Sequence, residues 1–196
     1  MPRMEIDLNP VTHLTADAIG QPGKRVFYIQ GQTVDKVVTL IVEKVQIQTL
    51  ALGVEDFLKE IKQRFPELAD ASGEYEEAIM HIMPPVDPLF RVGELALAYD
   101  SDSDLAILIA REITAQEEVQ PGLLEGEQEV EPAAEEETEG EDESSVVRFW
   151  CTRSQLHAMC RWGLEVAEHG RPICPYCGQP MDPAGHFCPK RNGHKH

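Results

Sequence analysis

The chain has 196 residues, of which 42% are hydrophobic, and carries a formal net charge of −18 at pH 7. This length and composition allow a packed core, which excludes a wholly disordered chain. The sequence has neither the roughly 20 apolar residues of a membrane span nor the apolar segment of a secretory signal, so we expect a cytoplasmic protein without membrane contact.

Acidic residues concentrate in the middle of the chain. Residues 1–115 carry 19 acidic and 10 basic residues, residues 116–145 carry 13 and none, and residues 146–196 carry 3 and 7. The middle segment has no aromatic residue and too little apolar surface to fold. We therefore predict an α+β domain over 1–115, an acidic disordered linker over 116–145, a helix over 146–172 that docks on the first domain, and a zinc-binding module over 173–196.

The first predicted elements are two strands. Pro22-Gly23 is typical of a turn, and the two segments that follow, Arg25–Gln30 and Lys36–Val42, are rich in Val, Ile, Phe and Tyr. Their separation by Gly31–Asp35 predicts a hairpin. The second segment is apolar on both faces, which indicates a central strand.

A helix is predicted from Lys44 onward. Apolar residues recur at steps of three and four along one stripe, namely Ile47, Leu50, Ala51, Val54, Phe57, Leu58, Ile61 and Phe65. Gly53 lies within this pattern and costs about 1 kcal/mol relative to alanine. Pro66 ends the run.

Three more strands are expected before the acidic segment. Ala78–Met83 reads as a short strand, and Phe90–Tyr99 with Asp104–Ile113 reads as a hairpin in which Ala96 and Ala98 form a small-residue face. The order β-β-α-β-β-β predicts an antiparallel sheet with packed helices, which is an α+β fold.

A second helix is expected after the acidic segment. Thr152-Arg153-Ser154 can cap its start and Gly170 can end it. Its apolar stripe predicts docking on the first domain, on the other face of the sheet, with Trp150 and Trp162 as anchors. A partner-binding face is the alternative interpretation of this stripe.

Cysteine spacing near the carboxyl terminus indicates a metal site. Cys174 and Cys177 are separated by two residues, as in a zinc knuckle that turns both thiolates toward one ion, and Cys188 follows. A reducing cytosol argues against a disulfide framework, and no thioredoxin-like pattern precedes the pair. Few large apolar side chains lie in this segment, so we expect a zinc ion to organise it.

A histidine must complete this site. Arg191 stands where a matching knuckle would have its fourth cysteine. His186 lies two residues before Cys188 and can face the same way on an extended strand, whereas His194 must return around a turn; the two compete as the fourth ligand. Four protein ligands leave no position for water, so we expect one structural Zn²⁺ per chain.

Three stretches, Gly20–Gly23, Phe90–Gly93 and Cys174–His194, resemble an uncharacterised bacterial family that is known mainly from actinobacteria and classed as a domain of unknown function. The last stretch contains its zinc-ribbon-like signature, Cys-Pro-x-Cys-Gly, Gly-His-x-Cys-Pro and Asn-Gly-His. The resemblance implies a bacterial cytosolic protein and brings no reaction with it.

No catalytic residue is assigned from the sequence. His81, on the expected strand at 78–83, can act as a base, but a histidine satisfied within a sheet is the commoner case. We therefore favour a non-enzymatic zinc protein that binds another cytosolic protein. One alternative is an enzyme whose active site lies unrecognised in the α+β domain. The other is a nucleic-acid-binding zinc ribbon. This second alternative is weaker, because the negative charge of the thiolate centre already explains the basic residues near it.

Overall fold

The computed structural model describes residues 3–113, 144–170, 174–179, 181, 186 and 188–190. Its strands are β1 (Glu5–Leu8), β2 (His13–Ile19), β3 (Val26–Gln32), β4 (Val37–Val42), β5 (Pro88–Asp100), β6 (Leu105–Glu112) and β7 (Val146–Cys151). Its helices are α1 (Lys44–Arg64), α2 (Glu77–Met80) and α3 (Arg153–Glu168). Within these ranges no helix combines the length and apolar character that a bilayer crossing needs.

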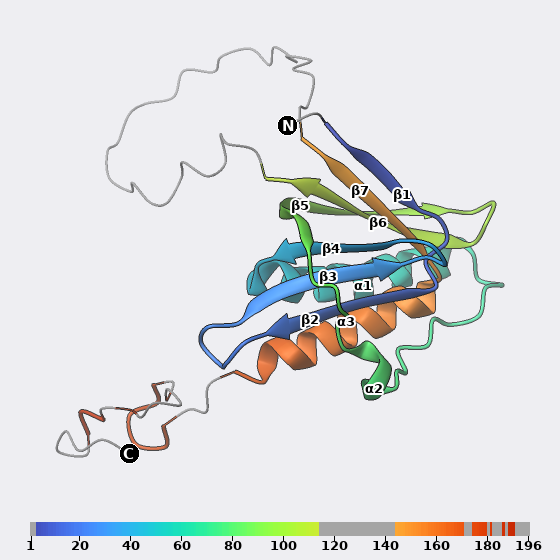
Figure 1. The fold of residues 1–196 in the computed structure, drawn as a ribbon. Helices are drawn as coiled ribbons and strands as arrows, with labels where there is room; N and C mark the ends of the chain where they lie inside the picture. Colours follow the sequence, from blue (N-terminus) through green and yellow to red (C-terminus); the bar gives the residue numbers. More distant parts are fainter. Residues whose placement is uncertain are drawn as a thin grey trace, which may run out of the picture.

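The strands form one seven-stranded sheet in the order β1-β7-β6-β5-β4-β3-β2. Figure 1 shows α1 and α3 together behind this sheet, so both long helices cover the same face. The architecture confirms the predicted α+β class. The expectation that α3 covers the other face is wrong, because α3 packs against α1 and β2.

The sheet is mixed, which corrects the prediction of an antiparallel one. β4 pairs in parallel with β5, and β1 pairs in parallel with β7, while the remaining neighbours are antiparallel. A parallel pair needs a long crossover connection, and α1 supplies it between β4 and β5. The sequence pattern places α1 correctly but does not reveal that it serves as this crossover.

The strand predicted over Ala78–Met83 is wrong. Residues 77–80 form the single-turn helix α2, and the chain then crosses the open face of the sheet in front of β2 and β3 (Figure 1). Polar side chains of β2 and β3 form hydrogen bonds with the backbone of this crossing segment. Asp17 accepts a hydrogen bond from the Ile82 N–H at 3.1 Å, and Gln30 makes two 2.9 Å hydrogen bonds with the Met83 backbone. These contacts take the place of a strand ladder.

Three strands, β1, β2 and β7, were not predicted from the sequence. β1 and β2 lie at opposite edges of the sheet, and β7 is inserted between β1 and β6. The segment 146–172 therefore begins with a strand rather than with the helix predicted there. The division of the chain into four segments stays a prediction, but the sheet takes strands from both sides of the acidic segment.

The predicted helices α1 and α3 are confirmed, and both begin with a capping box, of which only the one at Thr152 was predicted. The Glu43 N–H donates to the Gln46 side chain at 2.8 Å in a capping box before α1. The Thr152 hydroxyl accepts from the Gln155 N–H at 3.1 Å at the start of α3. Gly163 lets α3 approach closely, because a Cβ there would lie 3.0 Å from the Ala16 side chain. The core lies between these helices and the sheet.

Candidate metal centre

Four sequence-predicted ligands come together near the carboxyl terminus. The ligand atoms of Cys174, Cys177, His186 and Cys188 all lie within 4.8 Å of one another. Cys174 Sγ is 3.8 Å from Cys188 Sγ, and Cys177 Sγ is 3.1 Å from His186 Nε2. His194, the competing fourth ligand, lies outside the described residues.

The first knuckle is a tight turn closed by backbone hydrogen bonds. The Gly178 N–H donates to the Cys174 carbonyl and the Cys174 N–H donates to the Gln179 carbonyl, both at 2.9 Å. Gly178 has φ of 75°, a left-handed conformation that glycine adopts without a Cβ clash. The turn therefore brings the Cys177 side chain back toward Cys174, as the two-residue spacing predicts.

The sulfur–sulfur distance distinguishes a metal site from a disulfide. A disulfide bond is about 2.05 Å long, far below the 3.8 Å between the sulfurs of Cys174 and Cys188. Zinc–thiolate bonds of about 2.3 Å in a tetrahedron place two sulfurs roughly 3.8 Å apart. The pair thus has the spacing of two corners of a zinc tetrahedron.

The polypeptide around the cluster favours the thiolate form of Cys174. Donation by the Cys177 backbone N–H, helped by that of Tyr176 and by the neighbouring thiols, lowers the pKa of Cys174 to about 6. Burial raises the pKa of Cys177, which a bound cation would offset. Cys174, His186 and Cys188 are buried, so the cluster faces inward rather than toward solvent.

The other two cysteines lie in the core of the sheet and helices, away from this cluster. Burial raises the pKa of Cys151 to about 12, and burial also raises the pKa of Cys160. Both are therefore neutral thiols that pack as small apolar side chains.

The family described as "Protein of unknown function (DUF3090)" matches residues 6–188. The chain belongs to this family. The match spans all of the sheet except Glu5 and ends at Cys188, and it confirms the resemblance to a family of unknown function. No curated protein and no solved structure matches the chain.

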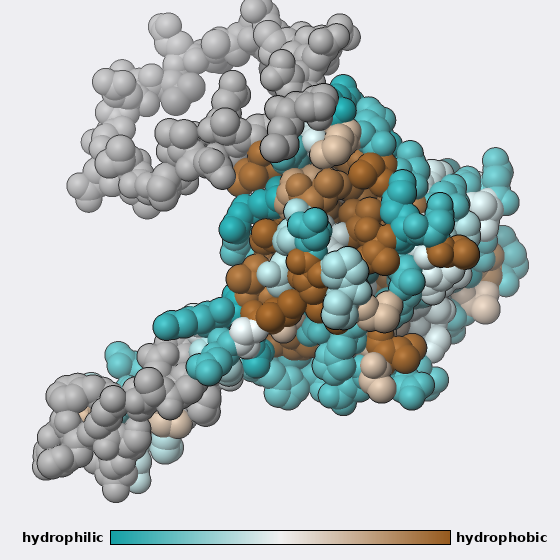
Figure 2. Space-filling model, in the orientation of Figure 1, coloured by the Kyte–Doolittle hydropathy of each residue, from teal (hydrophilic) through white to brown (hydrophobic). Residues whose placement is uncertain are grey.

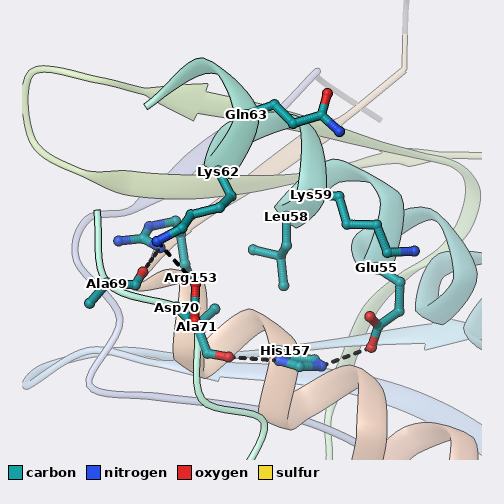
Figure 3. A pocket seen from close by; sticks show the side chains of 10 residues that line it. All are labelled: Glu55, Leu58, Lys59, Lys62, Gln63, Ala69, Asp70, Ala71, Arg153 and His157. Carbon is teal, nitrogen blue, oxygen red and sulfur yellow. Dashed lines mark hydrogen bonds and ion pairs between the residues drawn. The ribbon is translucent and has the colours of Figure 1, made fainter. Parts of the chain in front are cut away.

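A cavity of about 370 Å³ lies in this DUF3090 chain between α1, α3 and the irregular segment 65–76 (Figure 3). Its polar side chains hold that segment. The Lys62 ammonium lies 3.1 Å from the Asp70 carboxylate, and Arg153 donates to the Ala69 carbonyl at 2.7 Å. Further along α3, Arg161 donates to the Gly73 carbonyl at 2.9 Å. These contacts stabilise the loop rather than present free groups to a ligand.

His157 bridges α1 and the same segment. Its Nε2 lies 2.8 Å from the Glu55 carboxylate and its Nδ1 lies 3.2 Å from the Ala71 carbonyl (Figure 3). Both partners are hydrogen-bond acceptors, so the ring nitrogens are held between α1 and the 65–76 segment. Because both ring nitrogens are engaged, neither is available as a general base.

His81 does not occupy the strand position predicted for it. It ends α2, its side chain is 56% exposed, and its Nδ1 lies 3.2 Å from the buried Asp17 carboxylate. The adjoining cavity of about 350 Å³ also contacts Trp162. Among the described residues that line this cavity, none is Ser, Thr, Cys or Lys, so they supply the pair with no side-chain hydroxyl, thiol or amine nucleophile.

Proposed function

We propose that this DUF3090 protein is a non-enzymatic interaction protein whose carboxyl-terminal module is folded by one structural Zn²⁺. The observation that carries the zinc site is the convergence of four ligand atoms, at 4.8 Å or less from one another, from Cys174, Cys177, His186 and Cys188. All four coordination positions are then filled by protein, which leaves none for an activated water.

The donor set favours zinc over harder cations. Thiolates and an imidazole suit Zn²⁺, whereas Mg²⁺ and Ca²⁺ prefer oxygen ligands. His186 is the fourth ligand in this proposal, because its Nε2 already lies beside Cys177 Sγ. His194 is then not required for binding.

The metal has a structural task in this segment. From Cys174 to the end of the sequence the only large apolar side chains are Tyr176, Met181 and Phe187, and Tyr176 is 53% exposed. So few apolar groups cannot offset the chain entropy lost on folding. Structural zinc contributes roughly 10 to 16 kcal/mol of apparent binding free energy in small modules.

The residues that line the cavities favour an interaction role over a catalytic one. Lys62, Arg153 and His157 at the cavity of Figure 3 hold the 65–76 segment, and both ring nitrogens of His157 have a partner. We propose a cytosolic protein as partner, in a bacterial cytosol, as the family resemblance implies.

Elemental analysis of the purified full chain tests the zinc proposal. We expect close to one zinc per chain in protein prepared without chelator. Substoichiometric zinc would contradict the site, and another metal at full occupancy would contradict the choice of ion. Cys160→Ala is the matched control, because Cys160 is a buried thiol outside the cluster and its loss should leave the zinc content unchanged.

A further inference from the structure

The cysteines, all of which lie in the described part of the chain, differ in accessibility. Cys151 and Cys160 are buried in the core of the sheet and helices, and burial raises the pKa of Cys151 to about 12. Cys174 and Cys188 are buried in the metal cluster, whereas Cys177 is only half-buried. Cys177 is therefore the thiol that a small reagent in solution reaches most readily.

A bound zinc ion would hold this accessible thiol in its reactive form. A thiol that coordinates a metal ion is deprotonated, and the thiolate is the form that acts as a nucleophile. Susceptibility to oxidation follows thiolate character and exposure. In the zinc-loaded centre Cys177 combines the two properties, whereas the core thiols Cys151 and Cys160 have neither.

A second thiol lies beside Cys177 in the same turn. The sulfurs of Cys174 and Cys177 lie within 4.8 Å of each other, and the hydrogen bond from the Gly178 N–H to the Cys174 carbonyl closes the turn at 2.9 Å. The two sulfurs need to approach by less than about 3 Å to reach the disulfide bond length of about 2.05 Å. Cys188 belongs to the other half of the module, so Cys174 is the nearer reaction partner along the chain.

We propose that the zinc centre is a peroxide-sensitive switch, in which oxidation of Cys177 by hydrogen peroxide releases the metal. The Cys177 thiolate attacks one peroxide oxygen, the O–O bond breaks, and a sulfenic acid forms as hydroxide leaves. The Cys174 thiolate then attacks the Cys177 sulfur, the S–S bond forms and a second hydroxide leaves. Two thiolates thus give up two electrons, one peroxide becomes two hydroxide ions, and a thiol reductant reverses the change.

The disulfide removes half of the zinc ligands. His186 and Cys188 alone are too few for a structural zinc site, which takes four protein ligands. Figure 2 shows hydrophobic side chains gathered on the body of the protein, whereas the coloured atoms of the carboxyl-terminal segment are teal or pale. Figure 1 shows this segment beyond the end of α3, apart from the sheet. Oxidation should therefore unfold the module, which depends on its metal, and leave the body folded.

Peroxide treatment of the zinc-loaded full chain tests the switch. The protein is exposed to about 1 mM hydrogen peroxide, and released zinc is followed with a chromophoric chelator. Zinc should be released while a Cys174–Cys177 disulfide forms, and alkylation in denaturant should find Cys151 and Cys160 still reduced. Dithiothreitol with added zinc should restore the metal. Zinc that is retained under peroxide, or released without a disulfide, would overturn the proposal.

Two variants that exchange a thiolate for an imidazole separate the roles of the cysteines. Both keep four zinc ligands. Cys188→His retains Cys174 and Cys177 and should release zinc as fast as the wild type. Cys177→His retains only the two buried thiols of the cluster and should release zinc at least about ten-fold more slowly. Equal rates in the two variants would refute Cys177 as the point of attack.

Trapping of the sulfenic acid tests the same point in the unaltered chain. Dimedone added together with peroxide should label Cys177, and a label on Cys174 or Cys188 instead would refute the assigned order of attack. Cys160→Ala is the matched control, since it removes a buried thiol outside the cluster and should release zinc as the wild type does.

Zinc content before oxidation separates this inference from the proposed zinc module on which it rests. A chain purified without zinc would refute the module itself. A chain that holds one zinc and keeps it under peroxide would refute only the switch. Limited proteolysis of the oxidised protein should cut after residue 170 and spare the body; a module that stays resistant after zinc release would contradict the proposed unfolding.

Discussion

The body and the carboxyl-terminal module of this protein are stabilised by different physical means. In the body, apolar side chains between one sheet face and two helices form the core, and residues such as Leu8, Leu108 and Phe149 are fully buried. In the module, apolar groups are scarce, and three thiols and an imidazole converge instead. One chain thus combines a hydrophobic core, which many side chains stabilise together, with a cluster of only four metal ligands.

The largest expected effect is loss of the module alone. Cys177→Ser removes one thiolate, so zinc binding should be lost and the segment after residue 170 should become sensitive to protease. The body should keep its melting temperature, because its core includes none of the zinc ligands. Zinc content and limited proteolysis measure the change. Full zinc occupancy in this variant would contradict the ligand assignment.

The converse change should damage the body alone. Phe149→Ala truncates a fully buried side chain of β7 and should cost about 3 to 5 kcal/mol of unfolding free energy. Urea denaturation measures this loss, and zinc content at native conditions should be unchanged. A zinc content that falls together with the unfolding free energy would show that the two regions are not stabilised separately.

Acid should distinguish the two regions as well. The pKa of Cys174 is lowered from 9.0 to about 6, so its thiolate persists down to that pH and is protonated below it. A depressed acid pKa gives stabilisation that is lost as the pH falls through the folded value. Zinc should be retained at pH 7 and released as the pH falls further, because protons compete with the ion for the thiolates and the imidazole. Dialysis followed by metal analysis tests this, and zinc release that begins above pH 7 would be inconsistent with a lowered thiol pKa.

The histidine pair gives a direct comparison within the module. His186→Ala should abolish zinc binding, because His186 Nε2 lies 3.1 Å from Cys177 Sγ. His194→Ala should leave the zinc content close to one per chain. The reverse pattern would make His194 the fourth ligand.

The smallest effect is expected at the contact between α3 and the 65–76 segment. His157→Ala removes the contacts to Glu55 and Ala71 and should cost about 1 to 2 kcal/mol of unfolding free energy. Gln63→Ala is the matched control, since Gln63 lines the same cavity (Figure 3) but has no hydrogen bond to the other residues drawn there. Similar losses in both variants would mean that the bridge contributes nothing specific.

Local patterns were sufficient for the parts of this fold that depend on neighbours in sequence. The stripe of α1, the Thr152 cap of α3 and the hairpin of β5 and β6 were predicted because their signals lie within a few residues. The metal cluster was predictable for the same reason, since all of its ligands fall within fifteen residues, from Cys174 to Cys188.

Long-range pairing explains what the sequence did not reveal. β1 has only four residues and becomes a strand by pairing with β7, about 140 residues later. The segment at 78–83 looks like a strand by composition, but the polar side chains of Asp17 and Gln30 bind its backbone across the sheet. The bridge at His157 joins residues 86 and 102 positions apart, which no local pattern signals.

X-ray absorption at the zinc edge of the purified full chain tests the central claim most directly. The account predicts three sulfur ligands at about 2.3 Å and one nitrogen ligand at about 2.0 Å, with no bound water. Coordination by fewer sulfurs, or a water in the fourth position, would contradict a closed structural site made of Cys174, Cys177, His186 and Cys188.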